Sequence, residues 1–221
     1  MMFVKDIAAQ AAFLLGKEDL FRYLKGELAP EEGSAPTAAE QGTTPSDGVG
    51  MPASDGQDGT VDAEKLRELK RDADILLRCY NIVENEVALD YLPLTAEETI
   101  VCDTGALPYT AFLRARVSIL SVTDEYGNKL PYTVFPEYLR TRAGTSVITY
   151  SYSPESKRLC DASEYAARVP ERLLSYGVAC EYCLISGLYD EALVWDKKYK
   201  DALLCAHSAS RPRVIRSRRW V

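Results

Sequence analysis

The residues that could do redox or metal chemistry are two cysteines three positions apart, Cys180 and Cys183. Such a pair is typical of a thiol redox site when it opens a helix, because the helix dipole there lowers the thiol pKa. Here the pair falls in the middle of a predicted helix. A structural zinc site needs four ligands, and the chain has no second close cysteine pair and one histidine, His207. We therefore predict that both thiols pack as small hydrophobic groups, with no metal and no cofactor.

Acid–base and nucleophilic chemistry finds equally little support in the sequence. The only histidine, His207, lies where a predicted helix ends, a position at which the helix dipole favours it. The carboxylate pairs Glu97-Glu98 and Asp190-Glu191 are adjacent in sequence, so their side chains point in different directions. No glycine-rich phosphate loop is present. We predict that the protein is not an enzyme.

The last eleven residues, 211–221, have the charge pattern that is most informative about function. They hold five of the 26 basic residues and none of the 33 acids, so this arm carries +5 and the rest of the chain −12. Arginine forks pair bidentately with carboxylates, and the arm also has three large apolar side chains, which suit a buried surface better than water. We predict a docking arm for another protein, with these binding residues: Arg211, Arg213, Val214, Ile215, Arg216, Arg218, Arg219 and Trp220.

Length and composition indicate a globular chain. With 221 residues and 47% hydrophobic residues it can bury a substantial core without disulfides, so its six cysteines favour a reducing compartment. The apolar stretch 7–15 is interrupted by Gln10 and followed by charged, helix-like sequence, so we do not expect a signal peptide. No segment approaches the length that spans a membrane.

The elements that would position these residues are mostly helical. Apolar spacing predicts two short helices within 3–28, broken at Gly16, and a long helix from Asp62, its predicted cap, to Pro93. Between them, 29–60 holds six acids, no Lys or Arg, and mainly small residues, so we predict a disordered linker. The long helix has a heptad-like apolar seam: Leu66, Leu69, Ala73, Leu76, Tyr80, Val83 and Val87.

Within 99–152 the apolar residues no longer recur with the helical period, and this change predicts a small antiparallel β region. It contains three to five strands, a hairpin turn at 124–128, and a clear strand over 145–152. Three prolines, Pro108, Pro131 and Pro136, confine strands to edges or ends.

From Asp161 onward, the sequence again shows patterns that are typical of helices. A capping box is predicted from Asp161 and Glu164, and Pro170 should lie near a helix start. Two antiparallel helices joined at Gly187 should follow, and their inner faces step by three and four residues: Leu173, Gly177, Cys180 and Leu184, then Ala192, Trp195, Tyr199, Ala202 and Ala206.

The predicted fold class is therefore α+β: a mainly helical domain with a small antiparallel β region and an extended C-terminal arm. Its expected parts are an N-terminal helical segment (1–28), a disordered linker (29–60), an α+β domain (61–207) and a basic arm (208–221).

This order of elements resembles the head-tail connector proteins (adaptor or neck proteins) of tailed bacteriophages and prophages. The similarity covers roughly residues 62–221, and the linker 29–60 departs from it. It is carried by Tyr91-Leu-Pro-Leu94, the β segments 118–129 and 147–154, Leu188-Tyr-Asp-Glu-Ala192, Trp195-Asp-Lys-Lys-Tyr199 and the arginine-rich end.

The resemblance implies a non-enzymatic virion subunit, assembled in the bacterial host cytoplasm. It implies a ring of identical copies beneath the portal that extends the DNA channel toward a stopper or tail protein, without sequence readout of the DNA. The C-terminal arm would then bind the portal.

Three other functions stay open on the sequence alone. One is an enzyme of unrecognised type, which a deep pocket that gathers several acids or cysteines would support. The segment 187–192 also resembles the helix junction of tetratricopeptide repeats, which would make the chain a cytosolic interaction module, although no repeat follows at the expected spacing. The arm could instead bind DNA phosphates in a packaging accessory protein, against repulsion from the acidic body.

Overall fold

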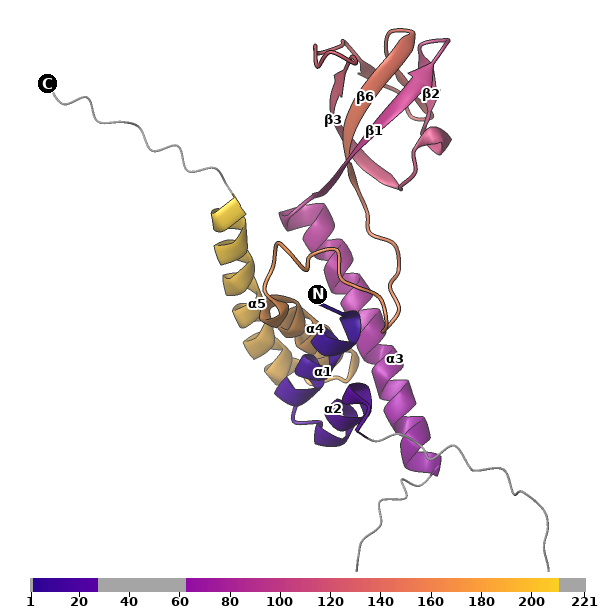
Figure 1. Cartoon of the computed structure of the whole chain (residues 1–221). Coiled ribbons are helices and arrows are strands. Elements are labelled where there is room, and N and C mark those ends of the chain that lie inside the picture. The colour runs from indigo at the N-terminus through magenta and orange to yellow at the C-terminus, as the bar shows by residue number, and fades with distance from the viewer. Residues whose placement is uncertain (1, 28–62, 211–221) are drawn as a thin grey trace, which may run out of the picture.

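The structure, a computed structural model, describes residues 2–27 and 63–210, with side chains up to Ser208. The predicted linker 29–60 and the arm residues from Arg211 onward lie outside the described residues. Helices gather into one body, and the strands extend from one end of it, as Figure 1 shows. The protein is thus α+β and mainly helical, as predicted. No helix in the described ranges is long and apolar enough to cross a membrane.

Two short helices open the chain, α1 (Val4–Leu14) and α2 (Glu18–Lys25), and they confirm the helical prediction for this segment. The chain turns between them at Gly16, whose φ of 70° lies in the left-handed region that glycine tolerates. Val4 and Ile7 of α1 are fully buried, and the Ser175 hydroxyl donates to the Ile7 carbonyl. The N-terminal helices therefore share one core with the later helices.

The long helix α3 (Ala63–Glu86) continues into one π-helical turn, η1 (Val87–Tyr91), just before Pro93. The predicted apolar seam is buried from Leu69 to Val87, and Leu66 is partly exposed. Of the apolar residues of α3 outside this seam, Cys79 is buried but Ile82 remains 49% exposed. Helix α3 is therefore central to the core along its second half and partly free on one side.

Six short strands follow, in two three-stranded antiparallel sheets. In the first, β6 (Gly144–Tyr152) lies between β1 (Leu94–Cys102) and β3 (Arg116–Thr123). In the second, β5 (Tyr138–Arg140) lies between β2 (Ala106–Pro108) and β4 (Thr133–Val134). The prediction of a small antiparallel region is confirmed, although it allowed five strands at most.

Two details of the β region differ from the sequence prediction. Strand β1 begins at Leu94, directly after Pro93, five residues before the predicted start. The turn at 124–128 is present, with Gly127 at φ 82° and the Asp124 carboxylate accepting from two backbone N–H groups. However, β3 pairs with β6, and the chain after the turn contributes only an isolated bridge to Thr123.

The predicted capping box at Asp161 and Glu164 is wrong. Residues 161–169 form turns, and α4 (Glu171–Ile185) begins after Pro170, consistent with the predicted place of that proline. Long-range contacts hold the turn segment instead. The Ser163 hydroxyl and the Glu164 backbone N–H both donate to the Glu84 carboxylate of α3. Tertiary partners here outweigh the local capping pattern.

The last two helices form the predicted antiparallel pair, α4 and α5 (Tyr189–Ser210). They join at Gly187, whose φ is 74°, and the Leu188 N–H donates to the Cys183 carbonyl across the turn. On the surface of α5, Asp196 and Lys200 form an ion pair one helical turn apart, at 2.7 Å.

Glu84 is an ionisable group inside the core, with 1% of its surface exposed. Its Oε1 accepts hydrogen bonds from Tyr80, Ser163 and Glu164, and its Oε2 has no partner among the described residues. Burial raises the pKa of Glu84, although these hydrogen bonds and the charge of Lys157 act in the opposite direction. The core therefore favours the protonated form.

Replacing Glu84 by glutamine should change the pH dependence of stability. A raised folded-state pKa gives stability that is present below the ordinary Glu value and is lost as pH rises through the folded value. We expect the free energy of unfolding of Glu84→Gln minus that of wild type, measured in urea titrations, to be larger near pH 8 than near pH 5, so that the variant gains relative stability at high pH. A difference that is equal at both pH values, or larger at low pH, would contradict this.

Candidate functional site

Cys180 and Cys183 lie in the middle of α4 and face the core. Cys183 is fully buried, and Cys180 is 6% exposed with its Sγ 3.6 Å from the Ala192 carbonyl oxygen. Burial raises the pKa of Cys183, and it raises the pKa of Cys180 to about 11. Both groups are therefore thiols at neutral pH, the form that is a poor nucleophile and a poor metal ligand. Within 2–27 and 63–210, no three His, Cys, Asp or Glu side chains gather as a metal site would require.

Replacing Cys180 and Cys183 by alanine should reduce stability only through the loss of packing contacts. We expect each substitution to lower the free energy of unfolding by about 1 kcal/mol, because a small buried group is lost and a small cavity remains. Denaturant unfolding measures this, and elemental analysis of the purified wild type provides the control. Stoichiometric metal in the wild type that disappears in the double variant would contradict the packing role.

The other candidate chemical groups are not brought together. Glu98 accepts hydrogen bonds from the Leu113 N–H and the Tyr150 hydroxyl, whereas Glu97 is exposed on the other side of β1. Asp190 and Glu191 lie in the first turn of α5, at the opposite end of that helix from His207. The Nδ1 of His207 is 3.0 Å from the Tyr91 carbonyl oxygen, a contact that ties the end of α5 to η1.

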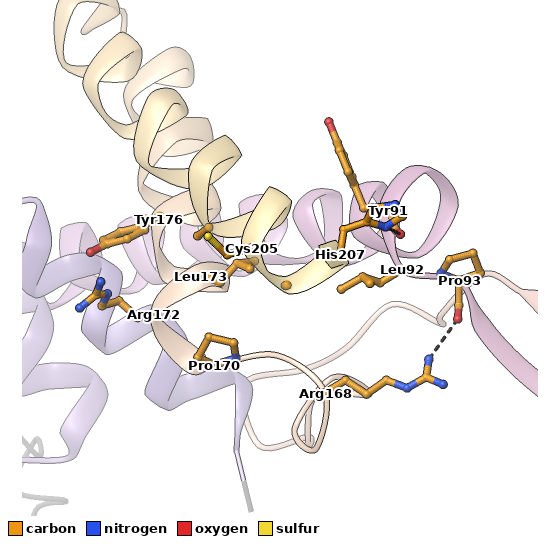
Figure 2. A pocket seen from close by; sticks show the side chains of 12 residues that line it. Tyr91, Leu92, Pro93, Arg168, Pro170, Arg172, Leu173, Tyr176, Cys205 and His207 are labelled. Atoms are coloured by element: carbon orange, nitrogen blue, oxygen red, sulfur yellow. Dashed lines mark hydrogen bonds between the residues drawn. The ribbon is translucent and has the colours of Figure 1, made fainter. Parts of the chain in front are cut away.

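A large groove lies where this contact is made, and Figure 2 shows the side chains around it. Its volume is about 1090 Å³. Three segments far apart in sequence build it: the end of η1 with the next two residues, the start of α4 with the residues just before it, and the last turns of α5. We call it the arm-base groove. Its lining residues are Tyr91, Leu92, Pro93, Arg168, Pro170, Arg172, Leu173, Tyr176, Ala202, Cys205, Ala206 and His207.

The floor of the arm-base groove is apolar. Leu92 and Leu173 are buried there, and the small side chains of Ala202 and Ala206, one helical turn apart on α5, leave the space open. The sequence had placed both alanines on the inner face of this helix. Two alanines one turn apart are the only sequence signal that this face would stay partly uncovered, and they do not show which segments lie beside it.

The charged groups of the arm-base groove are cationic. The Arg168 guanidinium donates to the Pro93 carbonyl at 3.0 Å, and that of Arg172 lies over the Tyr176 ring, 5.5 Å from its centroid. No aspartate or glutamate is among the lining residues named above. Helix α4 begins at the groove after Pro170, and Glu171 in its first turn offsets the positive end of its dipole, so the positive charge at the groove comes from the two arginines.

A second, smaller groove of about 230 Å³ lies between α3, α4 and α5. It is lined by the carboxylates of Glu86, Glu181 and Asp196, and by Cys180. Burial raises the pKa of both Glu86 and Glu181, and in Glu181 the nearby charge of Glu86 adds to the effect. Its volume is below the ~300–1,000 Å³ typical of small-molecule sites, and Asp196 is paired with Lys200. The arm-base groove is thus the larger candidate binding surface.

The residues predicted to bind a partner, Arg211 to Trp220, lie outside the described residues. The structure does place the point from which they start. Helix α5 runs to Ser210, and its residues Cys205, Ala206 and His207 line the arm-base groove. Sequence reasoning therefore found the arm and missed the surface next to it.

Comparison with known proteins gave no match, either to a protein-family model or to a curated protein sequence.

Proposed function

We propose that this chain is a structural virion subunit of a tailed bacteriophage or prophage. Copies of it form a ring that joins the portal to the tail and extends the DNA channel. Its partners are the portal protein, neighbouring copies of itself, a stopper or tail protein, and DNA that passes through without sequence readout. In this proposal the protein acts through its shape and surfaces and not as an enzyme.

The observation that carries the proposal is the arrangement around the end of α5. The last turns of α5 line the large apolar groove, the helix ends at Ser210, and a sequence segment of charge +5 follows in the chain. The remainder of the chain has a net charge of −12. An arm with this charge and three large apolar side chains is suited to an acidic protein surface. Because α5 ends next to the groove, we propose that the groove and the arm that follows the helix together form the docking end.

Exposed apolar side chains support contact between copies. A closed ring requires each subunit to present two different faces to its neighbours. Large apolar residues are at least 44% exposed around the junction of α4 and α5 and along the outside of α5: Leu184, Ile185, Leu188, Tyr189, Leu193, Val194 and Leu204. Exposed apolar side chains gathered on one region of a surface are typical of protein–protein interaction sites.

The described residues 2–27 and 63–210 also carry a net negative charge, which is consistent with a channel wall. If their excess carboxylates face the lumen, they repel DNA phosphates and let the duplex slide without adhering. This repulsion also makes a primary DNA-binding role less favourable. The alternative of a tetratricopeptide-like module is weakened by the two β-sheets, because an α-solenoid has none.

The experiment that tests the proposal is a mass measurement on the purified protein, alone and with purified portal rings. We expect a complex containing a whole ring of this chain on each portal. The protein alone can stay monomeric until it meets the portal. A failure of the full-length chain to join portal rings at any tested concentration would overturn the proposal.

A further inference from the structure

We infer that the arm-base groove is a docking site for an acidic amphipathic segment of the ring that the arm binds. The inference rests on the proposed function and adds a described surface to it, together with the chemistry of the bound segment. Size, surface chemistry, charge and position each contribute to the argument.

Size and surface chemistry favour a protein segment over a small ligand. The volume of about 1090 Å³ lies at the upper end of the ~300–1,000 Å³ usual for small-molecule sites, and the groove is open rather than enclosed, so it has room for a protein segment. Its floor offers Leu92, Leu173 and two alanines, which can accept large apolar side chains. A helix laid in such a groove inserts side chains three and four positions apart.

The charge of the groove favours a negatively charged bound segment. Arg168 and Arg172 both line the groove, and Glu171 in the first turn of α4 offsets the positive end of that helix's dipole without lining the groove itself. No carboxylate among the lining residues neutralises them. Glutamate or aspartate on the docked segment would pair with these guanidinium groups, and lysine would be repelled.

Position connects the groove to the arm. Arg211 follows the lining residue His207 by four positions, so a partner held by the arm is brought within reach of the groove. Both surfaces are cationic with apolar side chains, and one acidic partner surface satisfies both. The same charges disfavour the chain's own arm as the occupant, because its five arginines would face Arg168 and Arg172.

Cys205 provides a direct reporter of groove occupancy. Among the described residues, the exposed cysteines are Cys160 and Cys205, and only Cys205 lines the groove. In the full chain with Cys160→Ser, an environment-sensitive fluorophore on Cys205 should shift its emission saturably when portal rings are added. A fluorophore on Cys160 in a Cys205→Ser chain is the matched control and should not respond.

A charge reversal in the groove tests whether the bound segment of the partner is negatively charged. Arg172→Glu should weaken portal binding by about tenfold, as expected for loss of a charge-assisted contact. Lys197→Glu, an equal change of charge on exposed α5 surface away from the groove, should alter it less than twofold. Circular dichroism melting confirms that both variants are folded.

The outcomes separate this inference from the proposed function. If portal rings bind but the Cys205 fluorophore does not respond and Arg172→Glu binds normally, the groove inference fails and the proposed function stands. If portal rings do not bind at all, the proposed function fails. The groove inference is then tested separately with a synthetic Glu/Leu/Trp helical peptide and its Lys-containing counterpart. Absence of saturable binding that prefers the Glu peptide overturns the groove inference. Shielding of Cys205 that disappears on truncation after Ser210 would identify the chain's own arm as occupant and also overturn it.

Discussion

Truncation after Ser210 will leave the thermal melting of the body nearly unchanged and reduce its affinity for portal rings by at least about a hundredfold. The described core, including the fully buried Leu173 and Leu203, lies entirely before the cut. The lost segment holds five arginines and Trp220, the residue types that dominate binding energy at protein interfaces. The measurements are a melting curve and a binding titration on portal rings.

A charge-preserving variant provides the control for the truncation. Changing the five arm arginines to lysine keeps +5 but removes the planar fork that pairs bidentately with carboxylates. We expect binding between that of the wild type and that of the truncated chain, with a steeper loss in high salt. A fall in melting temperature of several degrees on truncation would contradict the docking role, because it would show that the arm packs on its own body.

Replacing Gly177 by leucine will destabilise the helical body by about 3 kcal/mol or more. Gly177 lies in α4 where α3 and α5 approach, and an added Cβ would be 2.7 Å from Val83 Cγ1 and 2.9 Å from Tyr199 Cε2. Extra atoms in a packed core usually cost 1–3 kcal/mol, and a leucine adds three more carbons beyond the Cβ. Chemical denaturation measures the loss, and ring formation on portals should fail with it.

Alanine at the same position decides between two opposing effects. Helix propensity alone would make Gly177→Ala more stable by about 1 kcal/mol. Overpacking against Val83 and Tyr199 acts in the other direction, and we expect it to win. Adding Val83→Ala should recover part of the loss that the Cβ at position 177 causes. A stabilised Gly177→Ala would mean that the three helices are less tightly packed than described.

Helices could be predicted from the sequence wherever one apolar stripe meets the core. The seam of α3 and the glycine breaks at Gly16 and Gly187 are local patterns, and the structure confirms them. The start of α4 was misplaced because Asp161 and Glu164 mimic a capping box. Their segment is held instead by Glu84, about 80 residues away along the chain. Such a contact has no local sequence signal.

The candidate site was predictable only in part for the same reason. The arm is a contiguous run of like charges, so composition alone identifies it. The groove beside it joins residues near 92, 170 and 205, and no spacing rule connects these three segments. Ala202 and Ala206 gave the one available signal, since two small residues one turn apart can mark a helix face with room beside it. Without the position of α4, that signal could not be interpreted.

Quantitative mass spectrometry of purified, DNA-filled phage particles tests the central claim most directly. The account predicts that this chain is present in a fixed ratio to the portal protein, and that a truncation after Ser210 is missing from particles although it is folded in the host. Absence of the full-length chain from such particles, with the protein recovered only from host cytosol, would contradict the account.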